Sequence, residues 1–388
     1  MEERSIVHMD LDTFFVSCEI RQNPQLGNIP LIIGGNSDRA VVASCSMEAR
    51  KFGIRSAMPV RHAKILCPQA KIINPDMDLY SKCSHEVTQI MEESAPVMER
   101  ASIDEFYLDV SGMDKFIGCY KWTNELVRKV NKETGLPISF GLSINKTVSK
   151  IATTEGKPKG KLNIASSMVR PFLNPLSIRR IPGLGTEKYE ELARSSIHII
   201  EQLAEVDIEL LHKMYGKDGI KLWHKAHGID NTPVEPYKEA KSISKSLTFD
   251  QDTIDIKKVK TLLAAFVENL SHQLREDGWL TSIVTIKIRY SNFDTSPKQK
   301  RIAHTALDKT LQRVVEDLFD KLYDRRMRIR LVGVSFSGLL RSSPQINLFD
   351  DTEKDINLLS TVDKIRKRFG FKAVMTAQTL GWYQQVIK

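Results

Sequence analysis

The 388-residue chain has few cysteines, and they do not form a pattern that indicates disulfides or a zinc site. The five cysteines are odd in number, scattered, and contain no C-x-x-C pair. Small disulfide-rich proteins and zinc ribbons need regularly spaced cysteines. The cysteines therefore predict a protein of a reducing compartment, and a cytoplasmic location is expected.

Long apolar runs are also absent, as is a secretory leader. The first residues, Met1-Glu2-Glu3-Arg4, include two acids, and no apolar run approaches the roughly 20 residues that span a bilayer. We find no internal repeat and no low-complexity segment. The sequence predicts neither membrane insertion nor export.

Basic residues exceed acidic ones, and most of the excess lies in one segment. The chain has 57 Lys and Arg against 48 Asp and Glu, a formal net charge of +9. Residues 238–341 hold 20 Lys and Arg against 13 Asp and Glu, a net charge of +7. A localised positive charge favours a polyanionic partner such as nucleic acid. With this length and 41% hydrophobic residues, two to four domains are expected.

Acidic residues interrupt two stretches that alternate like strands. In residues 101–110, Asp104 and Glu105 stand together among alternating apolar positions, which predicts a strand with an acidic pair midway. Neighbouring side chains on a strand face opposite sides, so the pair indicates cations or a hairpin apex. A second predicted strand, residues 5–12, also ends in acids. Convergence on one Mg²⁺ site and two separate solvated strand ends both remain open.

The order of predicted elements in the first part of the chain is that of a ferredoxin-like sheet with an insertion. The elements are a strand at 5–12, an insertion at about 11–75, a helix at 76–93, a β-hairpin that includes the strand at 101–110, a helix at 114–133 and a strand at 137–144. The insertion contains predicted strands at 30–35 and 40–45 and a short helix at 46–53. A further helix begins at residue 145 and runs into a basic turn, with five lysines and one glutamate in residues 146–161.

Residues 174–228 are predicted to be helical with short breaks. The turn at residues 181–185 lies between two helices, and its Gly183 and Gly185 resemble a helix-hairpin-helix turn. Small residues there expose backbone N–H groups to a DNA phosphate. A plain turn between helices is the alternative.

A tether at residues 232–240 leads to a module at 241–340 that is predicted to be β-α-β-β-α-β. Basic residues alternate with apolar ones on its predicted strands, which favours binding to a nucleic-acid backbone. They are Lys287, Arg289, Arg301, Arg328 and Arg330. In the tail, adjacent Leu348 and Phe349 in a polar setting are typical of a docking peptide, with local packing as the alternative.

Six stretches, in this order, resemble the Y-family translesion DNA polymerases, and among them the bacterial DNA polymerase IV branch. They are residues 7–15, 48–59, 102–105, 141–146, 157–158 and 181–185. The resemblance extends to about Phe349 and implies an α+β multidomain, right-hand polymerase fold. The implied domains are a ferredoxin-like palm (1–10 and 76–165), small fingers (11–75), a helical thumb with a helix-hairpin-helix (166–232), a linker (233–240), a βαββαβ little finger (241–340) and a tail (341–388).

The resemblance also implies roles for individual residues. Asp10, Asp104 and Glu105 match the catalytic acids that bind two Mg²⁺ ions together with the backbone carbonyl of Leu11. Phe15, beside Phe14, matches the steric gate that excludes a ribose 2′-hydroxyl.

Further residues match substrate and partner contacts. The nucleotide contacts are Phe14, Ser44, Met47, Arg50 and Lys157, and the sliding-clamp peptide is residues 345–349 with Gln345, Leu348 and Phe349. Met47 is a departure, because the family usually has a tyrosine there whose hydroxyl donates to the triphosphate.

The implied activity is template-directed, low-fidelity DNA synthesis without proofreading, in translesion synthesis and untargeted mutagenesis. The implied substrates are primer–template DNA and deoxynucleoside triphosphates, the implied partner is the sliding clamp, and a monomer is expected. A nucleotidyl cyclase also uses paired acids on a similar sheet, but it lacks the thumb turn, the basic module and the clamp-like peptide. A catalytically inactive, polymerase-derived DNA-binding scaffold should have lost one of the three acids, and all are present.

Overall fold

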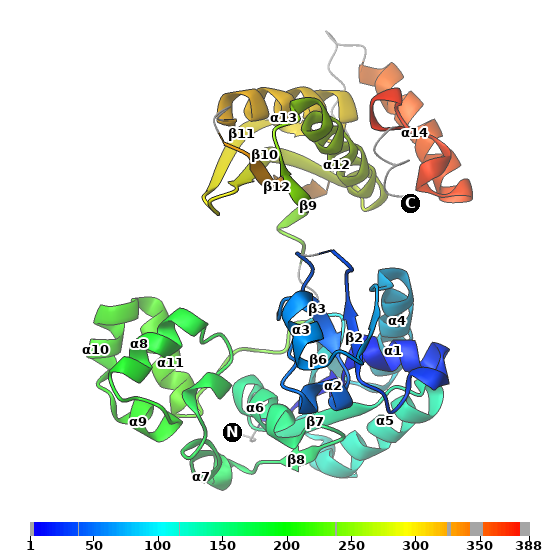
Figure 1. Ribbon diagram of the computed structural model, residues 1–388. Coiled ribbons are helices and arrows are strands. Elements are labelled where there is room, and N and C mark those ends of the chain that lie inside the picture. The colour runs from blue at the N-terminus through cyan, green and yellow to red at the C-terminus, as the bar shows by residue number, and fades with distance from the viewer. Residues whose placement is uncertain are drawn as a thin grey trace. The chain divides into compact units, whose positions relative to one another are not determined.

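The computed structural model describes residues 4–37, 39–115, 117–236, 239–323, 327–341 and 352–380. The chain divides into two compact units, Met1–Lys238 and Glu239–Lys388 (Figure 1). No helix in the described part is long and apolar enough to cross a membrane. The predicted docking peptide at residues 345–349 lies outside the described residues.

The first unit is built on a five-stranded sheet with the order β5-β6-β1-β7-β8. Its strands are β1 (Ile6–Leu11), β5 (Val97–Arg100), β6 (Glu105–Asp109), β7 (Ile138–Ser143) and β8 (Lys161–Asn163). Central strand β1 pairs antiparallel with both β6 and β7, and β8 is added parallel to β7. Without β8, this is the sheet of a ferredoxin-like fold, so the predicted fold class is confirmed.

Helices cover the two faces of this sheet differently. The helices α4 (Met77–Ser94) and α5 (Cys119–Thr134) pack on one face, where Val7, Met9 and Leu11 of β1 join their core. The helix α6 (Lys146–Gly156) packs on the other face against β1 and β7. Because side chains alternate along a strand, His8 and Asp10 face the α6 side.

The stretch 101–110 is not one continuous strand, which corrects that prediction, whereas the hairpin apex that the acidic pair indicated is confirmed. Strand β5 ends at Arg100, β6 begins at Glu105, and residues 101–104 form the apex of the hairpin. The backbone N–H groups of Ala101 and Ser102 both donate to the carbonyl of Glu105, at 2.9 and 3.2 Å. At an apex neither acid has to enter the core, which is why the hairpin reading holds. Helix α5 also begins later than predicted, after a 3-10 turn η2 (Met113–Lys115).

The insertion between β1 and α4 folds around a small core of its own. It begins with α1 (Phe14–Gln22) and a 3-10 turn η1 (Pro24–Leu26). A three-stranded sheet of order β3-β2-β4 follows, with the helices α2 and α3. The bounds are β2 (Leu31–Gly34), β3 (Val42–Cys45), α2 (Met47–Lys51), α3 (Val60–Leu66) and β4 (Lys71–Ile73). Apolar residues such as Ile32, Ala49 and Val60 are buried in this core.

Short helices form the rest of the first unit and share another core, which includes Ile178, Leu192 and Leu211. They are η3 (Ser166–Met168), α7 (Val169–Leu173), η4 (Ile178–Arg180), α8 (Thr186–Arg194), α9 (Ile200–Glu205), α10 (Ile208–Tyr215) and α11 (Lys217–Ala226). The glycine turn at residues 181–185 lies between η4 and α8.

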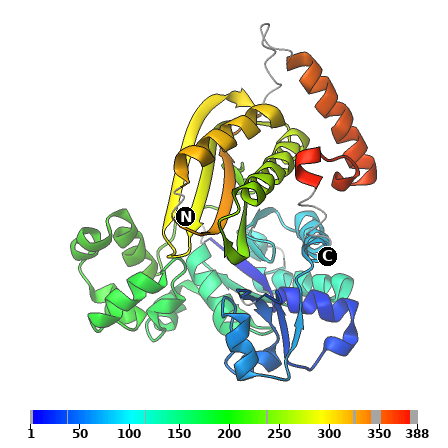
Figure 2. The ribbon, with the colours of Figure 1, turned by 45° about the horizontal axis from the view of Figure 1, so that its top comes forward.

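The second unit contains a four-stranded antiparallel sheet of order β11-β10-β12-β9. Its elements are β9 (Ser242–Thr253), α12 (Ile256–Glu276), β10 (Trp279–Tyr290), β11 (Thr295–Thr305), α13 (Asp308–Leu322), β12 (Ile329–Ser337) and a short β13 (Leu340–Arg341). The predicted order β-α-β-β-α-β is confirmed. The helices α12 and α13 cover one face of the sheet (Figure 2).

The tail after residue 351 belongs to the second unit, although the sequence predicted too little there to define structure. It forms α14 (Thr352–Phe369) and η5 (Phe371–Ala373). Arg366 of α14 pairs with Glu268 of α12, and the two side chains are only 2% and 4% exposed. The hydroxyl of Thr379 donates to the other oxygen of Glu268 at 2.7 Å. This buried ion pair docks the tail on α12.

We predict that Arg366→Ala releases the tail from α12. Removing one partner of a buried ion pair leaves the other charge buried, which costs about 3–5 kcal/mol. The free energy of opening α14, measured by hydrogen exchange on the full chain, should fall by this amount or to zero. Arg368→Ala, at an exposed position of the same helix, is the control and should leave exchange unchanged. Equal protection of α14 in the two variants would show that the ion pair does not hold the tail.

Candidate active site

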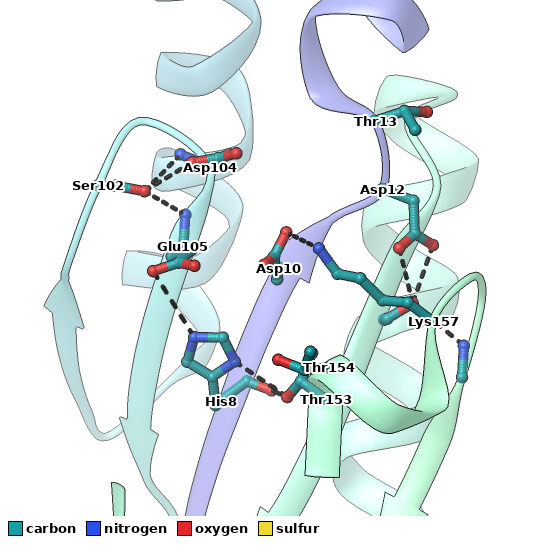
Figure 3. Close-up of polar contacts among 12 residues, drawn as sticks. His8, Asp10, Asp12, Thr13, Ser102, Asp104, Glu105, Thr153, Thr154 and Lys157 are labelled. Atoms are coloured by element: carbon teal, nitrogen blue, oxygen red, sulfur yellow. Dashed lines mark hydrogen bonds and ion pairs between the residues drawn. The ribbon is translucent and has the colours of Figure 1, made fainter. Parts of the chain in front are cut away.

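Acidic residues of β1 and β6 lie on the same face of the sheet because the strands pair in register. Asp10 is directly opposite Glu105, and His8 is opposite Tyr107. Cross-strand partners in an antiparallel pair project from the same face. The two carboxylates therefore share the face that α6 partly covers, beside the hairpin apex (Figure 3).

The apex brings the third acid to the same edge of the sheet. The carbonyl of Asp104 accepts a hydrogen bond from the backbone N–H of Leu11 at 3.1 Å, which ties the apex to the end of β1. The hydroxyl of Ser102 donates to Asp104 Oδ1 at 2.6 Å and lies 3.1 Å from the backbone nitrogen of Glu105. Ser102 therefore holds the turn that presents both acids.

Two lysines balance the charge of the paired acids. Lys157 Nζ lies 2.5 Å from Asp10 Oδ1, and Lys150 Nζ lies 2.5 Å from Glu105 Oε2. Burial raises the pKa of Asp10 to about 7, although Lys157 opposes this. The pKa of Glu105 is lowered to about 2 by the facing His8 ring, against burial and with help from Lys150. The two neighbouring carboxylates thus differ in how readily they take up a proton.

The chemistry of the donor set fits a hard divalent cation. Asp10, Asp104 and Glu105 supply carboxylate oxygens, and the backbone carbonyl of Leu11 lies at the same strand end, which are the ligand types that Mg²⁺ prefers. In the part of the chain that the structure describes, no group of three or more His, Cys, Asp or Glu side chains is arranged to hold a metal ion. Ammonium groups stand beside Asp10 and Glu105 instead.

An aromatic pair follows β1 directly, at the start of α1. Phe14 is 3% exposed and belongs to the core of the sheet. Phe15 is only partly buried, and its ring stacks on Tyr80 of α4 with centroids 4.3 Å apart and an angle of 13°. The Tyr80 hydroxyl donates to Glu19 Oε1 at 2.7 Å. Phe15 is therefore held in place by Tyr80, whereas Phe14 is buried in the core of the sheet.

The remaining nucleotide candidates lie on β3 and α2 of the insertion. Ser46 caps α2, since its side chain accepts from the backbone N–H of Ala49. Met47 follows and is 40% exposed, while Ser44 on β3 is half-buried. Arg50 is half-buried, and its Nε is buried without a hydrogen-bond partner among the described residues. A buried, unsatisfied guanidinium nitrogen is a position that an anionic ligand could satisfy.

The sequence reasoning did not identify four residues that support the acids. Two are His8 and Lys150, which lie beside Glu105. Asp12, only 4% exposed, accepts from the hydroxyl of Ser139 and from the backbone N–H of Lys159, so it holds the loop after α6. Thr153 of α6 bonds to His8. The alternation along residues 5–12 could have identified His8, because it places His8 on the face of Asp10.

The glycine turn at residues 181–185 lies beside lysines of the neighbouring helices. Gly183 has φ +88°, in the left-handed region that favours glycine, and Gly185 precedes the first residue of α8. Lys225 Nζ donates to the carbonyl of Pro182 at 2.8 Å. A cavity of about 190 Å³ at this turn is lined by Pro182, Gly183, Leu184, Lys188, Tyr215, Asp218, Lys221, Leu222 and Lys225. Three of these nine residues are lysines, which favours an anionic ligand.

The basic candidates of the second unit separate into two groups. Lys287, Arg289 and Arg301 lie on the face of the sheet away from α12 and α13, since they alternate with the buried Ile286 and Ile288 or pair with Ile283. Arg328 precedes β12, and the guanidinium of Arg330 lies over the ring of Phe293 at 4.3 Å. The structure thus brings three of the five residues to one face.

Comparisons with known proteins agree over both units. A sequence model of the impB/mucB/samB family matches residues 9–154, and one of the C-terminal domain of that family matches residues 240–348. The DNA polymerase IV of Dehalococcoides mccartyi is 35% identical over 383 residues, which is 98% of each chain. The DNA polymerase IV of Methanoculleus marisnigri is 34% identical over 341 residues, 87% of this chain and 94% of that one.

Solved structures are also similar to this chain. A Y-family DNA polymerase chimera has a TM-score of 0.77 and 25% sequence identity, over 87% of this chain and 100% of the other. DinB from Sulfolobus solfataricus has a TM-score of 0.59 and 27% identity, over 86% of this chain and 98% of that one.

The support that α6 gives to the acids depends on a glycine. A Cβ at Gly141 of β7 would lie 2.3 Å from the carbonyl oxygen of Ser149 and 2.6 Å from the nitrogen of Thr153, both in the backbone of α6. We predict that Gly141→Ala destabilises the first unit by about 1–3 kcal/mol or more, because overpacking forces the backbone to shift. Urea unfolding measures the loss of stability, and hydrogen exchange of β1, β7 and α6 in the folded chain shows where it arises. Gly185→Ala, where nothing lies within 4 Å, is the control, and an equal loss there would contradict the prediction.

Proposed function

The chain belongs to the Y-family DNA polymerases and is a DNA-directed DNA polymerase similar to DNA polymerase IV, and from this premise we propose that it extends a primer 3′-hydroxyl with deoxynucleotides by a two-Mg²⁺ mechanism. The assignment to this family rests on relatives that are 35% identical over 98% of the chain. One observation carries the proposal for the site, namely that Asp10 and Glu105 pair across β1 and β6 beside the apex that carries Asp104.

These relatives confirm the family and the enzyme class that the six sequence stretches predicted. They also confirm the predicted class of activity, which is translesion synthesis with DNA binding. A nucleotidyl cyclase and an inactive scaffold were the alternatives from sequence. The matched C-terminal domain favours the polymerase over the cyclase, because a cyclase has no counterpart to that domain.

We propose that Asp10, Asp104, Glu105 and the carbonyl of Leu11 hold the two ions. Bound there, such a pair of ions supplies charge neutralisation at the attacking and leaving oxygens of an in-line displacement. The residues of the chain then mainly orient the reactants, because phosphoryl transfer depends on positioning and electrostatic stabilisation. Lys157, which pairs with Asp10 in the structure, is proposed to bind the triphosphate together with Arg50 and Ser44.

The proposed DNA contacts come from both units. In the first unit they are the backbone N–H groups at Gly183 and Gly185, and in the second unit they are the five basic residues from Lys287 to Arg330. We propose the palm, fingers, thumb and little finger with the bounds expected from the resemblance. We also propose that Gln345, Leu348 and Phe349 bind the sliding clamp and that the protein is a monomer. We further propose that it synthesises DNA with low fidelity and without proofreading, and that it causes untargeted mutagenesis.

Asp104→Ala tests the two-metal site. Loss of a metal ligand removes several kcal/mol of transition-state stabilisation, and each 1.36 kcal/mol is about a factor of ten in rate. We expect primer extension to fall at least about 100-fold, while affinity for primer–template DNA, measured by fluorescence anisotropy, stays within about twofold because different residues bind the backbone.

Asp109→Ala is the matched control, since Asp109 ends β6, the strand that begins directly after Asp104, and its side chain accepts from Ser111 at that far end. It should extend primers at close to the wild-type rate. Extension by the Asp104 variant at more than a few per cent of the wild-type rate would refute the proposed role of Asp104.

Phe15→Ala tests the steric gate. We expect the selectivity for deoxyribonucleotides over ribonucleotides, measured as the ratio of kcat/KM values, to fall at least about tenfold, because the pocket gains room for a hydroxyl. Deoxynucleotide use should change little. Phe52→Ala, at a position 43% exposed, is the control. Unchanged sugar selectivity in the Phe15 variant would mean that another residue acts as the gate.

A further inference from the structure

A buried histidine beside Glu105 has a nitrogen without a partner. His8 lies on central strand β1 and is 1% exposed. Its Nε2 has no hydrogen-bond partner in the described part of the chain, and it faces Glu105 Oε2 at 3.9 Å (Figure 3). That distance is too long for a hydrogen bond. A buried nitrogen left unpaired costs stability, so its position beside a carboxylate calls for an explanation.

The orientation of the His8 ring is set by contacts on its other sides. Its Nδ1 lies 2.9 Å from the hydroxyl oxygen of Thr153, and the ring packs on Tyr107 with centroids 4.7 Å apart. Thr153 reaches β1 because α6 packs closely on Gly141 of β7, where no side chain intervenes. Ser149 of the same helix donates to the carbonyl of Ile6 at 2.7 Å. The ring therefore cannot turn its Nε2 away from Glu105 without breaking these contacts.

The protonation forms of the ring differ in what they offer Glu105. The hydroxyl proton of Thr153 has three acceptors at 2.9 Å, namely Nδ1 of His8, the carbonyl of His8 and the carbonyl of Ser149. If Thr153 donates to Nδ1, the neutral ring carries its proton on Nε2 and donates toward Glu105. The opposite tautomer would direct a lone pair at a carboxylate, which is repulsive. If Thr153 donates to a carbonyl instead, Nδ1 is the donor, so it is the negative charge of Glu105 that favours the form with a proton on Nε2.

We propose that His8 is a positioning residue for the divalent-cation site, in which its ring, oriented by Thr153, directs Nε2–H at Oε2 of Glu105 so that the other carboxylate oxygen is presented to the cation. This inference rests on the proposed function. Groups behind the ligands of a metal site commonly orient them in this way, and their loss typically lowers metal affinity or activity by 10–100-fold. Lys150 holds the same oxygen of Glu105 in the structure, so the two donors act on one side of the carboxylate.

A purely structural role for His8 is the alternative. It would account for the burial of the ring and for the contact with Tyr107, because a buried aromatic ring contributes packing wherever it lies. It would not account for an unpaired nitrogen directed at Glu105, since an apolar side chain of similar size would fill the space without that cost.

Substitutions of His8 and Thr153 in the full chain separate these roles. His8→Leu removes the donor, His8→Gln retains an amide N–H that can reach the Nε2 position, and Thr153→Val removes the hydroxyl with little change in shape. We expect His8→Leu to raise the dissociation constant for Mn²⁺, measured by electron paramagnetic resonance without DNA, about tenfold or more. The Mg²⁺ concentration that half-saturates single-nucleotide insertion should rise in parallel, whereas the affinity for primer–template DNA should not change.

His8→Gln should restore most of the metal affinity, and Thr153→Val should lie between the wild type and His8→Leu. The control is His85→Leu on the exposed surface of α4, which should match the wild type. A metal affinity of His8→Leu equal to that of the wild type would overturn the proposal. Equal losses in His8→Leu and His8→Gln, with equal losses of thermal stability, would instead assign His8 a structural role and would also overturn it.

A measurement on the wild-type chain does not depend on how the variants fold. Ring ¹⁵N shifts of the metal-free chain, with the His8 signals assigned through His8→Gln, report which nitrogen carries the proton. We expect a protonated Nε2, and an unprotonated Nε2 would overturn the proposal. The proposed function is tested separately. A wild-type chain without Mg²⁺-dependent primer extension would refute the proposed function. An active wild type, together with a His8→Leu variant of unchanged metal affinity, would refute only the role of His8.

Discussion

The pairing of β1 with β6 is the constraint on which the rest of the site depends. Because Asp10 lies opposite Glu105, both carboxylates project from one face at one end of the sheet. A slip of one residue would turn every side chain of β1 to the other face and place Asp10 among α4 and α5. The buried Val7, Met9 and Leu11 oppose such a slip, since it would bring them to the α6 side. The hydrophobic core thus sets the geometry of the acids.

Helix α6 places positive charge beside the two carboxylates that this register brings together. Its close approach over Gly141 allows Ser149 and Thr153 to bond to β1, and it places Lys150 against Glu105. Two half-buried carboxylates side by side would repel each other without such compensation. The loop after the helix adds Lys157 beside Asp10, and Asp12 holds that loop through the backbone of Lys159. One helix and its loop therefore supply most of the compensating charge.

Elements with strong periodicity could be predicted from the sequence, whereas contacts between distant residues could not. The first helix predicted in the module at 241–340 is α12 (Ile256–Glu276), and the pattern of β10 was recognised because Lys287 and Arg289 alternate with apolar residues. The sequence predicted a hairpin between the two helices, but it did not place the apex at 101–104, because bonds to Ser102 and the pairing with β1 decide that position. The docking of the tail depends on Arg366 and Glu268, and nothing local in the sequence identifies that pair.

The same reasoning explains why the resemblance identified the acids but not the residues behind them. A motif records which residue types recur, and it placed Asp10, Asp104 and Glu105 in one site without their geometry. The roles of His8 and Lys150 follow only from distances to Glu105 across the sheet. Lys157 adds a constraint, because its ammonium no longer neutralises Asp10 once it moves away to bind a phosphate. If Lys157 binds the triphosphate as proposed, Asp10 is balanced either by a proton or by another cation, and a divalent ion at that carboxylate meets this requirement.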